Sequence, residues 1–493
     1  MEAFDTKKSS CSFLCLLSQH AHAPFTKEWV IVLKHDYAIL KYLFCQLVTV
    51  FTFKDLEKGV LMMVNFSLSN AFSFRDAQNL SMLAVSSSKD DINQANVVTL
   101  KNERVLKSAL IFGANASGKS NLIKTLSLMR DIVLHSVQAI ESSITKNVIP
   151  FLLSEAGPNS PTEMEVVFIS EGVKYRYGIS LLQGVIKEEW LYYTPSSRET
   201  ILFERDSNSI EINKAAFGEA NLFVKDGLIQ KTRADVPFIS VVAGFDGEHS
   251  KRVVNWFSDI AVISGSNESA FTAITLKLIN ESSDFKSWIK KILPAFQISD
   301  IYLDEVAPEL PFNDIKTDDD NLKNLFSSIA NLAKTQKMFS LRVIKKTANG
   351  EISVPIDFES EGTKKIVYLL GPIYNAMKSG GLLLVDEFDS KFHTLLSKFL
   401  FALFHEQSEH GSQIIAAVQD VNLMSTEFFR RDQIWFVDKD IKSGGSNIYS
   451  LVEYKEKQRT LKASYGHDYL TGAFDAIPLF NDYKHIDVLM SEE

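Results

Sequence analysis

The residues with the clearest chemistry form a glycine-rich run, Gly113-Ala114-Asn115-Ala116-Ser117-Gly118-Lys119-Ser120. Its two glycines let the backbone turn its N–H groups inward, where they can surround a phosphate. The lysine after the second glycine can reach the β- and γ-phosphates of a nucleotide, and the next hydroxyl can ligate Mg²⁺. The pattern predicts an ATP–Mg²⁺ site made by Gly113, Asn115, Ser117, Gly118, Lys119, Ser120 and Asn121.

Two acids follow an apolar run near the other end of the chain, in Leu382-Leu383-Leu384-Val385-Asp386-Glu387. A buried strand that ends in acids brings them to the carboxyl edge of a parallel sheet, where α/β proteins bind ligands. We expect Asp386 to hold Mg²⁺ together with Ser120, and Glu387 to polarise the attacking water. Acids at a strand end are often only caps, so this interpretation depends on the phosphate-binding loop earlier in the chain.

A third group, Ser360-Glu361-Gly362-Thr363, opens a predicted helix ahead of the acids. Its hydroxyl, its backbone amides and the positive end of the helix dipole could bind an anion. The alternative is an ordinary N-cap, because serine begins many helices. The position of Ser360 and Gly362, just ahead of the apolar run 366–370 and the acidic pair, favours anion binding.

The elements that would position these groups have the patterns of an α/β protein. Near-continuous apolar runs at 105–112, 382–385, 414–418 and 434–437 predict buried strands of a mostly parallel sheet. Helical periodicity follows Ser120 and recurs at 395–404. Alternating residues at 64–68, and the stretch 79–85, predict further strands near the start.

The predicted organisation has five parts. The ATPase head would be built from both ends of the chain, with a mixed α+β insertion that has its own small sheet. The boundaries are 1–62 for an N-terminal extension, 63–150 for the first part of the head, 151–340 for the insertion, 341–455 for the second part of the head and 456–493 for a tail.

Composition excludes several classes of protein. A net charge of −9 argues against a protein that coats nucleic acid by bulk attraction. The three cysteines, Cys11, Cys15 and Cys45, all precede Met62, so a disulfide framework is not expected and a cytoplasmic location is. The apolar stretch 37–53 is shorter than the roughly 20 residues that span a bilayer. We therefore expect no membrane association and interpret 1–62 as an extension upstream of a start at Met62 or Met63.

With these motifs in this order, the chain resembles ABC-type ATPases of the SMC, RecF and OLD group. It is most similar to the stand-alone AAA ATPases of bacterial abortive-infection and anti-restriction operons, the RloA/AbiL-like proteins. Further resemblance comes from Asn65-Phe66, from Asp386-Glu387-Phe388-Asp389 with His393, and from Ile434-Trp435-Phe436-Val437-Asp438. The resemblance implies a P-loop head that dimerises or forms a higher homo-oligomer. In it, Ser360 and Gly362 meet the γ-phosphate bound by the other copy. It also implies a role in antiviral defence with a separate TOPRIM-like effector nuclease.

The chain departs from this family after the strand 414–418, where Gln419 stands in place of the usual histidine. An amide can hydrogen-bond a phosphate oxygen but cannot take up a proton or carry a positive charge, so turnover is expected to be slow. Two alternatives remain: a RecF-like DNA-repair ATPase that binds DNA, and an ATP-binding scaffold with little hydrolysis. A self-contained nuclease using Asp438 and Asp440 is disfavoured, because a turn after a strand explains both acids.

Overall fold

The computed structural model describes residues 59–476, apart from 87–92, 101–102, 139–142, 265–267, 307–337, 391, 408–410, 454–464, 471–473 and 475. The chain divides into two compact units, Met1–Phe51 and Thr52–Glu493. Nearly all of the predicted extension, 1–62, and most of the predicted tail, 456–493, lie outside the described residues. The account below concerns the second unit.

Six strands form the sheet that carries the chemistry. They are β5 (Ser108–Phe112), β13 (Ile260–Ile263), β17 (Leu382–Val385), β18 (Gln413–Ala417), β19 (Ile434–Lys439) and β20 (Ser446–Ser450). Their order is β13-β17-β18-β5-β19-β20, and all neighbours are parallel except β19 and β20. Every residue of β5, β17 and β18 is buried, as expected for parallel strands covered on both faces. The predicted mostly parallel sheet is therefore confirmed.

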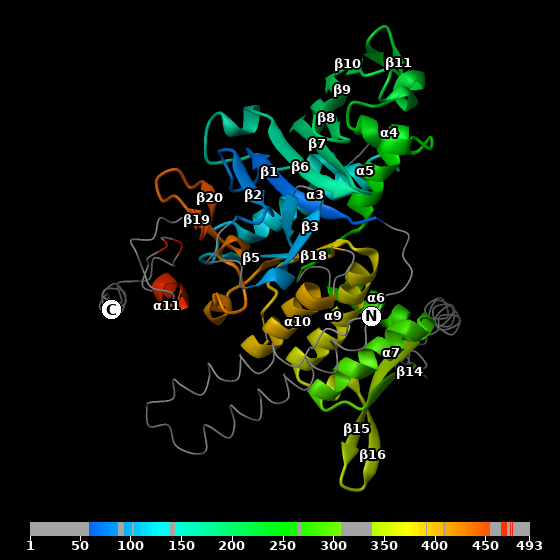
Figure 1. Cartoon of the computed structure of the whole chain (residues 1–493), viewed down its shortest axis with the longest axis vertical. Helices are drawn as coiled ribbons and strands as arrows, with labels where there is room; N and C mark the ends of the chain where they lie inside the picture. The colour runs from blue at the N-terminus through cyan, green and yellow to red at the C-terminus, as the bar shows by residue number, and fades with distance from the viewer. Residues whose placement is uncertain are drawn as a thin grey trace, which may run out of the picture. The chain divides into compact units, whose positions relative to one another are not determined.

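Three helices cover this sheet: α3 (Lys119–His135), α9 (Glu361–Ser379) and α10 (Thr394–Gln407). α3 contacts β17 and β18, and it lies on the opposite side of the sheet from α9 and α10 (Figure 1). The buried residues of α3, including Leu122, Leu126 and Met129, recur at three- and four-residue spacing. The helices predicted after Ser120 and at 395–404 are confirmed.

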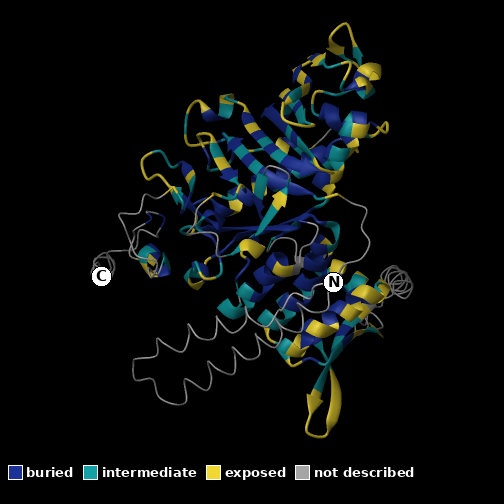
Figure 2. Cartoon of the chain, viewed as in Figure 1, coloured by how far each residue is buried: buried dark blue, intermediate teal, exposed yellow. Residues whose placement is uncertain are grey.

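A second, larger sheet has nine antiparallel strands in the order β11-β12-β10-β9-β8-β7-β6-β1-β2. They are β1 (Met62–Ser69), β2 (Gln78–Ser81), β6 (Thr162–Ser170), β7 (Val173–Leu182), β8 (Val185–Thr194), β9 (Thr200–Asp206), β10 (Ser209–Ile212), β11 (Val224–Lys225) and β12 (Leu228–Ile229). Along much of β6 and β8, buried residues alternate with intermediate or exposed ones, in keeping with the striped pattern of this sheet in Figure 2.

This sheet differs from the expected small sheet of an insertion. β1, from the predicted first part of the head, pairs with β6 along its whole length, from Met62↔Ile169 to Ser69↔Glu163. The expected boundary at 150 therefore falls inside one continuous sheet. Sequence patterns identify strands but not their partners, because pairing is decided by burial against distant residues.

The segment 151–340 also supplies a strand to the parallel sheet. After α4 (Phe238–Ala243) and α5 (Glu248–Ser258), β13 pairs in parallel with β17, in register from Ile260↔Leu382 to Ile263↔Val385. α5 also contacts α3 and β6, so it packs between the two sheets. The segment expected as an insertion is thus part of the framework on which the acidic strand β17 lies.

A smaller three-stranded sheet, β14 (Asp300–Val306), β15 (Met338–Thr347) and β16 (Gly350–Pro355), accompanies α6 (Glu268–Glu281) and α7 (Ser283–Ile292). The β15–β16 hairpin is exposed at its tip (Figure 2). Two of its basic residues have partners within the chain: Arg342 donates to the Ser353 carbonyl at 3.1 Å, and Lys345 pairs with Glu359 at 2.7 Å.

The remaining elements are the hairpin β3 (Val97–Leu100) and β4 (Glu103–Leu106), and the short α11 (Tyr465–Leu470). Within the residues described above, none of the helices is both long and apolar enough to cross a membrane.

Candidate functional site

The glycine-rich loop joins the end of β5 to the start of α3, as its pattern predicts. Gly118 has φ +120°, and a Cβ there would lie 2.5 Å from Ser446 Oγ. Gly113 has φ +154°, and its Cβ would lie 2.3 Å from the carbonyl oxygen of Val437. Side chains are excluded at both positions by backbone conformation and by space. The loop can therefore present its N–H groups to a ligand only with glycine at these two positions.

Lys119 is the first residue of α3 and is 9% exposed. Its Nζ donates hydrogen bonds to the carbonyl oxygens of Gly113 at 2.7 Å and Ala114 at 3.0 Å. Burial lowers the pKa of Lys119 below its usual value. Three carboxylates oppose this pKa shift: those of Asp386, Asp389 and Glu387. The ammonium is therefore held by two carbonyls of the loop, with three carboxylates near enough to act on its pKa.

Ser120 and Asp386 are far apart in sequence but adjacent in space. Ser120 Oγ donates to Asp386 Oδ1 at 3.1 Å, which joins the start of α3 to the end of β17. No group of three or more His, Cys, Asp or Glu side chains arranged as a metal site is found among the described residues. Mg²⁺ does not need one, because it is commonly held by one or two protein oxygens together with phosphates and water. This pair of oxygens fits that ligand set.

Glu387 follows Asp386 in an unusual backbone conformation. Its φ is +52°, and its N–H donates to Asp386 Oδ1 at 3.1 Å. A left-handed backbone conformation at a non-glycine residue costs free energy, and such residues concentrate at functional sites. The Glu387 side chain is exposed and faces the cavity at the loop. Its carboxylate is thus available to a ligand or to water.

A cavity of about 500 Å³ collects these groups. Its walls are the loop from Asn115 to Asn121, the two acids, and Gln419. Ser73 and Lys439 also line it, and sequence reasoning missed both. Ser73 Oγ accepts a hydrogen bond from Asn121 Nδ2 at 2.9 Å, a contact that no local sequence pattern predicts. Lys439 ends a parallel strand, so the rule applied to Asp386 could have found it.

Gln419 lies two residues after the end of β18, with an exposed side chain at the cavity wall. Its N–H donates to Asp389 Oδ2 at 2.8 Å, and the N–H of Asp420 donates to the same oxygen. Asp389 is 8% exposed and was not among the predicted site residues. It links the loop of Glu387 to the turn of Gln419, so these two cavity residues are positioned together.

Ser360 and Gly362 lie at the start of α9, and neither is among the residues that line this cavity. Ser360 Oγ accepts a hydrogen bond from the N–H of Thr363 at 3.2 Å, so the serine is the N-cap of the helix. Within a single chain, Ser360 is therefore observed as a helix cap. Anion binding by this turn stays a prediction that requires a second molecule.

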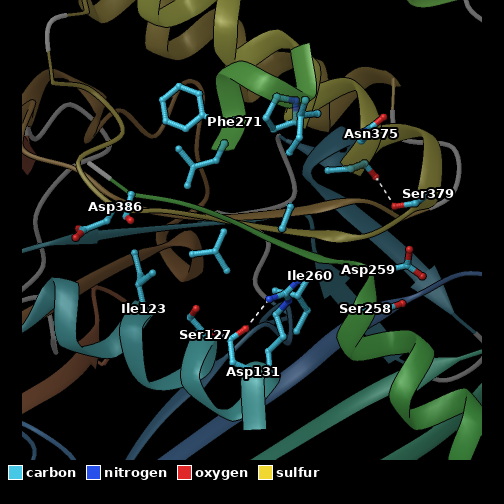
Figure 3. A pocket seen from close by; sticks show the side chains of 18 of the residues that line it. Ile123, Ser127, Asp131, Ser258, Asp259, Ile260, Phe271, Asn375, Ser379 and Asp386 are labelled. Atoms are coloured by element: carbon cyan, nitrogen blue, oxygen red, sulfur yellow. Dashed lines mark hydrogen bonds and ion pairs between the residues drawn. The ribbon is translucent and has the colours of Figure 1, made fainter. Parts of the chain in front are cut away.

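A neighbouring cavity of about 880 Å³ lies between β13, α3, α6 and α9 (Figure 3). It shares Ser120 and Asp386 with the smaller cavity. Its other walls mix apolar side chains such as Ile123, Ile260 and Phe271 with polar ones such as Asn375. It has neither the loop glycines nor Lys119, so the smaller cavity is the candidate site.

Three other polar or charged residues, Arg430, Asp440 and His393, have contacts within the chain. Arg430 is 1% exposed and pairs with Asp432 at 2.7 Å, so it is not a surface contact for DNA. Asp440 Oδ1 accepts the N–H of Ser443 at 2.6 Å, which closes the turn after β19. His393 Nδ1 accepts the N–H of Leu395 at 3.2 Å near the start of α10.

Comparison with known proteins identifies a family that matches the chain. A family model described as "AAA domain, putative AbiEii toxin, Type IV TA system" matches residues 108–425, more than half of the 493-residue chain. That range includes the glycine-rich loop, Ser360 and the two acids. No curated protein matches the chain.

Three solved structures match the chain at low identity and with TM-scores below 0.5. An SMC head bound to the C-winged helix domain of ScpA is 14% identical, with 79% of this chain and 97% of that chain covered and a TM-score of 0.39. The SMC head domain from Thermotoga maritima is 14% identical, with 79% and 98% covered and a TM-score of 0.35. The recombination mediator protein RecF is 12% identical, with 79% and 99% covered and a TM-score of 0.34.

Proposed function

The chain belongs to the AAA-domain family whose model matches residues 108–425, and on this premise we propose that it binds ATP with Mg²⁺ and hydrolyses it to ADP and phosphate. The observation that carries the proposal is the 3.1 Å contact of Ser120 with Asp386, with Lys119 and Glu387 at the same cavity. A phosphate cradle, a pair of oxygens suited to Mg²⁺ and a free carboxylate are the parts that phosphoryl transfer to water requires.

Each residue has a distinct task in this proposal. The N–H groups of the loop hold the phosphates, and Lys119 moves its hydrogen bonds from the Gly113 and Ala114 carbonyls to the β- and γ-phosphate oxygens. Ser120 and Asp386 hold Mg²⁺, which offsets the charge of the phosphates. Glu387 orients a water and takes its proton as the water oxygen attacks the γ-phosphorus; the bond from the γ-phosphorus to the β,γ-bridging oxygen breaks, and ADP leaves. The charge that develops on the phosphate is stabilised by Lys119 and the loop amides.

We further propose that two copies of the chain close around two ATP molecules. Ser360 and Gly362 lie outside the cavity of their own chain, so only the nucleotide of another copy could use their amides and helix dipole. Phe358, two residues earlier, is 80% exposed. A large apolar side chain beside a predicted anion-binding turn supports an interface that covers both.

Phe358→Asp tests this dimer. We expect ATP binding to be unchanged and the dissociation constant of the ATP-dependent dimer to rise at least roughly tenfold, because a buried ring is replaced by a charge. Sizing with light scattering, with and without ATP–Mg²⁺, measures the change. Phe245→Asp is the matched control, because Phe245 is 70% exposed but follows α4, which lies away from α9 in Figure 1. If ATP–Mg²⁺ does not change the oligomeric state of the wild-type chain, the proposed site shared between two copies is refuted.

Gln419 favours a second candidate function, a nucleotide-gated scaffold that hydrolyses ATP slowly. If Gln419 faces the γ-phosphate, Gln419→His should raise kcat roughly tenfold with little change in ATP affinity. An imidazole can add one charge-assisted contact in the transition state, worth about 1–2 kcal/mol. Steady-state phosphate release measures kcat, and a nucleotide titration measures affinity. An unchanged or lower kcat in a folded variant would mean that Gln419 does not sense the γ-phosphate.

For the cellular role we propose an ATPase of an anti-phage defence system that acts with a separate effector. The family's description as a putative AbiEii toxin of a type IV TA system supports this role. Three basic residues that could serve a DNA-repair ATPase, Arg342, Lys345 and Arg430, have partners within the chain. The neighbouring gene separates the two roles: a small TOPRIM-like nuclease fits defence, whereas replication genes fit repair.

A further inference from the structure

Lys365 connects the helix that begins at Ser360 to the loop that carries Glu387. It lies five residues after Ser360, in the second turn of α9. Its Nζ donates to the carbonyl oxygen of Glu387 at 3.0 Å, to that of Ser390 at 3.1 Å, and to Ser390 Oγ. One ammonium therefore satisfies three oxygens of the turn from Glu387 to Ser390.

The turn from Glu387 to Ser390 depends on these bonds for its shape. Ser390 Oγ also donates to the Glu387 carbonyl at 2.9 Å, and the Lys365 ammonium lies 4.9 Å from the centre of the Phe392 ring. The left-handed conformation of Glu387, at φ +52°, persists only if surrounding contacts hold it. Lys365 supplies the contact to this carbonyl that comes from α9, so it acts on the direction of the Glu387 side chain.

The opposite side of the same turn is held by Asp389. Its Oδ2 accepts the N–H groups of Gln419, at 2.8 Å, and of Asp420. The loop that carries Glu387 is thus hydrogen-bonded to α9 through Lys365 and to the segment after β18 through Asp389. A displacement of α9 would be passed to Glu387 through Lys365, because a helix is rigid over the one and a half turns from Ser360 to Lys365.

We propose that Lys365 is a positioning residue that makes hydrolysis depend on docking of the Ser360 turn. When Ser360 and Gly362 engage the nucleotide of the other copy, α9 fixes Lys365, and Lys365 aligns Glu387 in its own site. This inference rests on the proposed dimeric ATPase. Lys365 touches no nucleotide in this scheme, so its contribution is to kcat and not to ATP binding.

Lys365→Met tests the role, because methionine keeps much of the side-chain length and removes the donor. We expect kcat to fall at least roughly tenfold, with the KM and the dissociation constant of ATP within a factor of two. Lys365→Arg, which can still donate to both carbonyls, should recover part of the loss. Lys378→Met is the matched control on the same helix; Lys378 approaches Asp284 at 3.8 Å and is far from the Glu387 turn.

A double-mutant cycle with Glu387→Gln separates positioning from other effects. If Lys365 acts through Glu387, adding Lys365→Met to Glu387→Gln should change the residual turnover less than twofold. An equal loss of turnover in both backgrounds, or loss of ATP binding or dimerisation in Lys365→Met, would overturn the inference. If the wild type neither hydrolyses ATP nor dimerises, the proposed function itself fails. If it does both and Lys365→Met matches it, only this inference fails.

Discussion

Lys119→Ala is expected to weaken ATP binding by at least roughly 100-fold, or about 3 kcal/mol. Lys119 is the cation at the base of the loop, where three carboxylates, those of Asp386, Asp389 and Glu387, act on its pKa. Without the ammonium, those carboxylates would face the triphosphate with less compensation, and the loop carbonyls of Gly113 and Ala114 would lose their donor. Isothermal titration with ATP–Mg²⁺ measures the affinity.

Lys124→Ala is the control for this loss. Lys124 lies one turn further along α3, with its Nζ 4.6 Å from the centre of the Phe72 ring, and it lines the neighbouring cavity. The variant loses the same charge from the same helix and should bind ATP nearly as the wild type does. Micromolar ATP affinity retained by folded Lys119→Ala would disprove the assignment of the phosphate-binding loop.

Glu387→Gln should keep ATP bound and lower kcat by roughly 10²–10⁴-fold, the usual contribution of a positioned general base. Glutamine has the size and hydrogen-bonding reach of glutamate but cannot take the proton of the attacking water. Because ATP persists, the variant should accumulate as the closed dimer. Phosphate release measures turnover, and sizing in ATP–Mg²⁺ measures assembly.

The control for Glu387→Gln is Glu351→Gln, the same change on the exposed β15–β16 hairpin. It should leave both turnover and assembly unchanged. If Glu387→Gln turns over at the wild-type rate, the base is another group, and the turn of Glu387 has a structural role only. If turnover falls but no dimer accumulates, hydrolysis does not depend on closure.

Strand and helix patterns were informative wherever burial alone decides structure. The continuous apolar runs at 382–385 and 414–418 became β17 and β18, buried on both faces, and the periodic stretch after Ser120 became α3. Residue order also indicated which groups would meet, because parallel strands end at one edge of a sheet. That rule anticipated the contact of Ser120 with Asp386, 266 residues apart.

Other features depend on contacts that no local pattern encodes. The choice of β6 as the partner of β1, and of β17 as the partner of β13, depends on how distant segments pack together. For the same reason the expected insertion 151–340 could not be recognised as part of both sheets. Ser73 and Asp389 were missed because their contacts at the cavity come from turns far away in sequence.

The sequence by itself therefore determined the chemistry of the loop, because glycine, lysine and serine at fixed spacing leave few other uses for a strand–loop–helix. It also determined that the acids follow a buried strand. Only the tertiary structure decided that Ser360 lies outside the cavity of its own chain and that Lys365 joins its helix to the turn of Glu387. Both facts follow from the packing of α9 against the sheet, which brings the fifth residue of a helix to a loop 22 residues later.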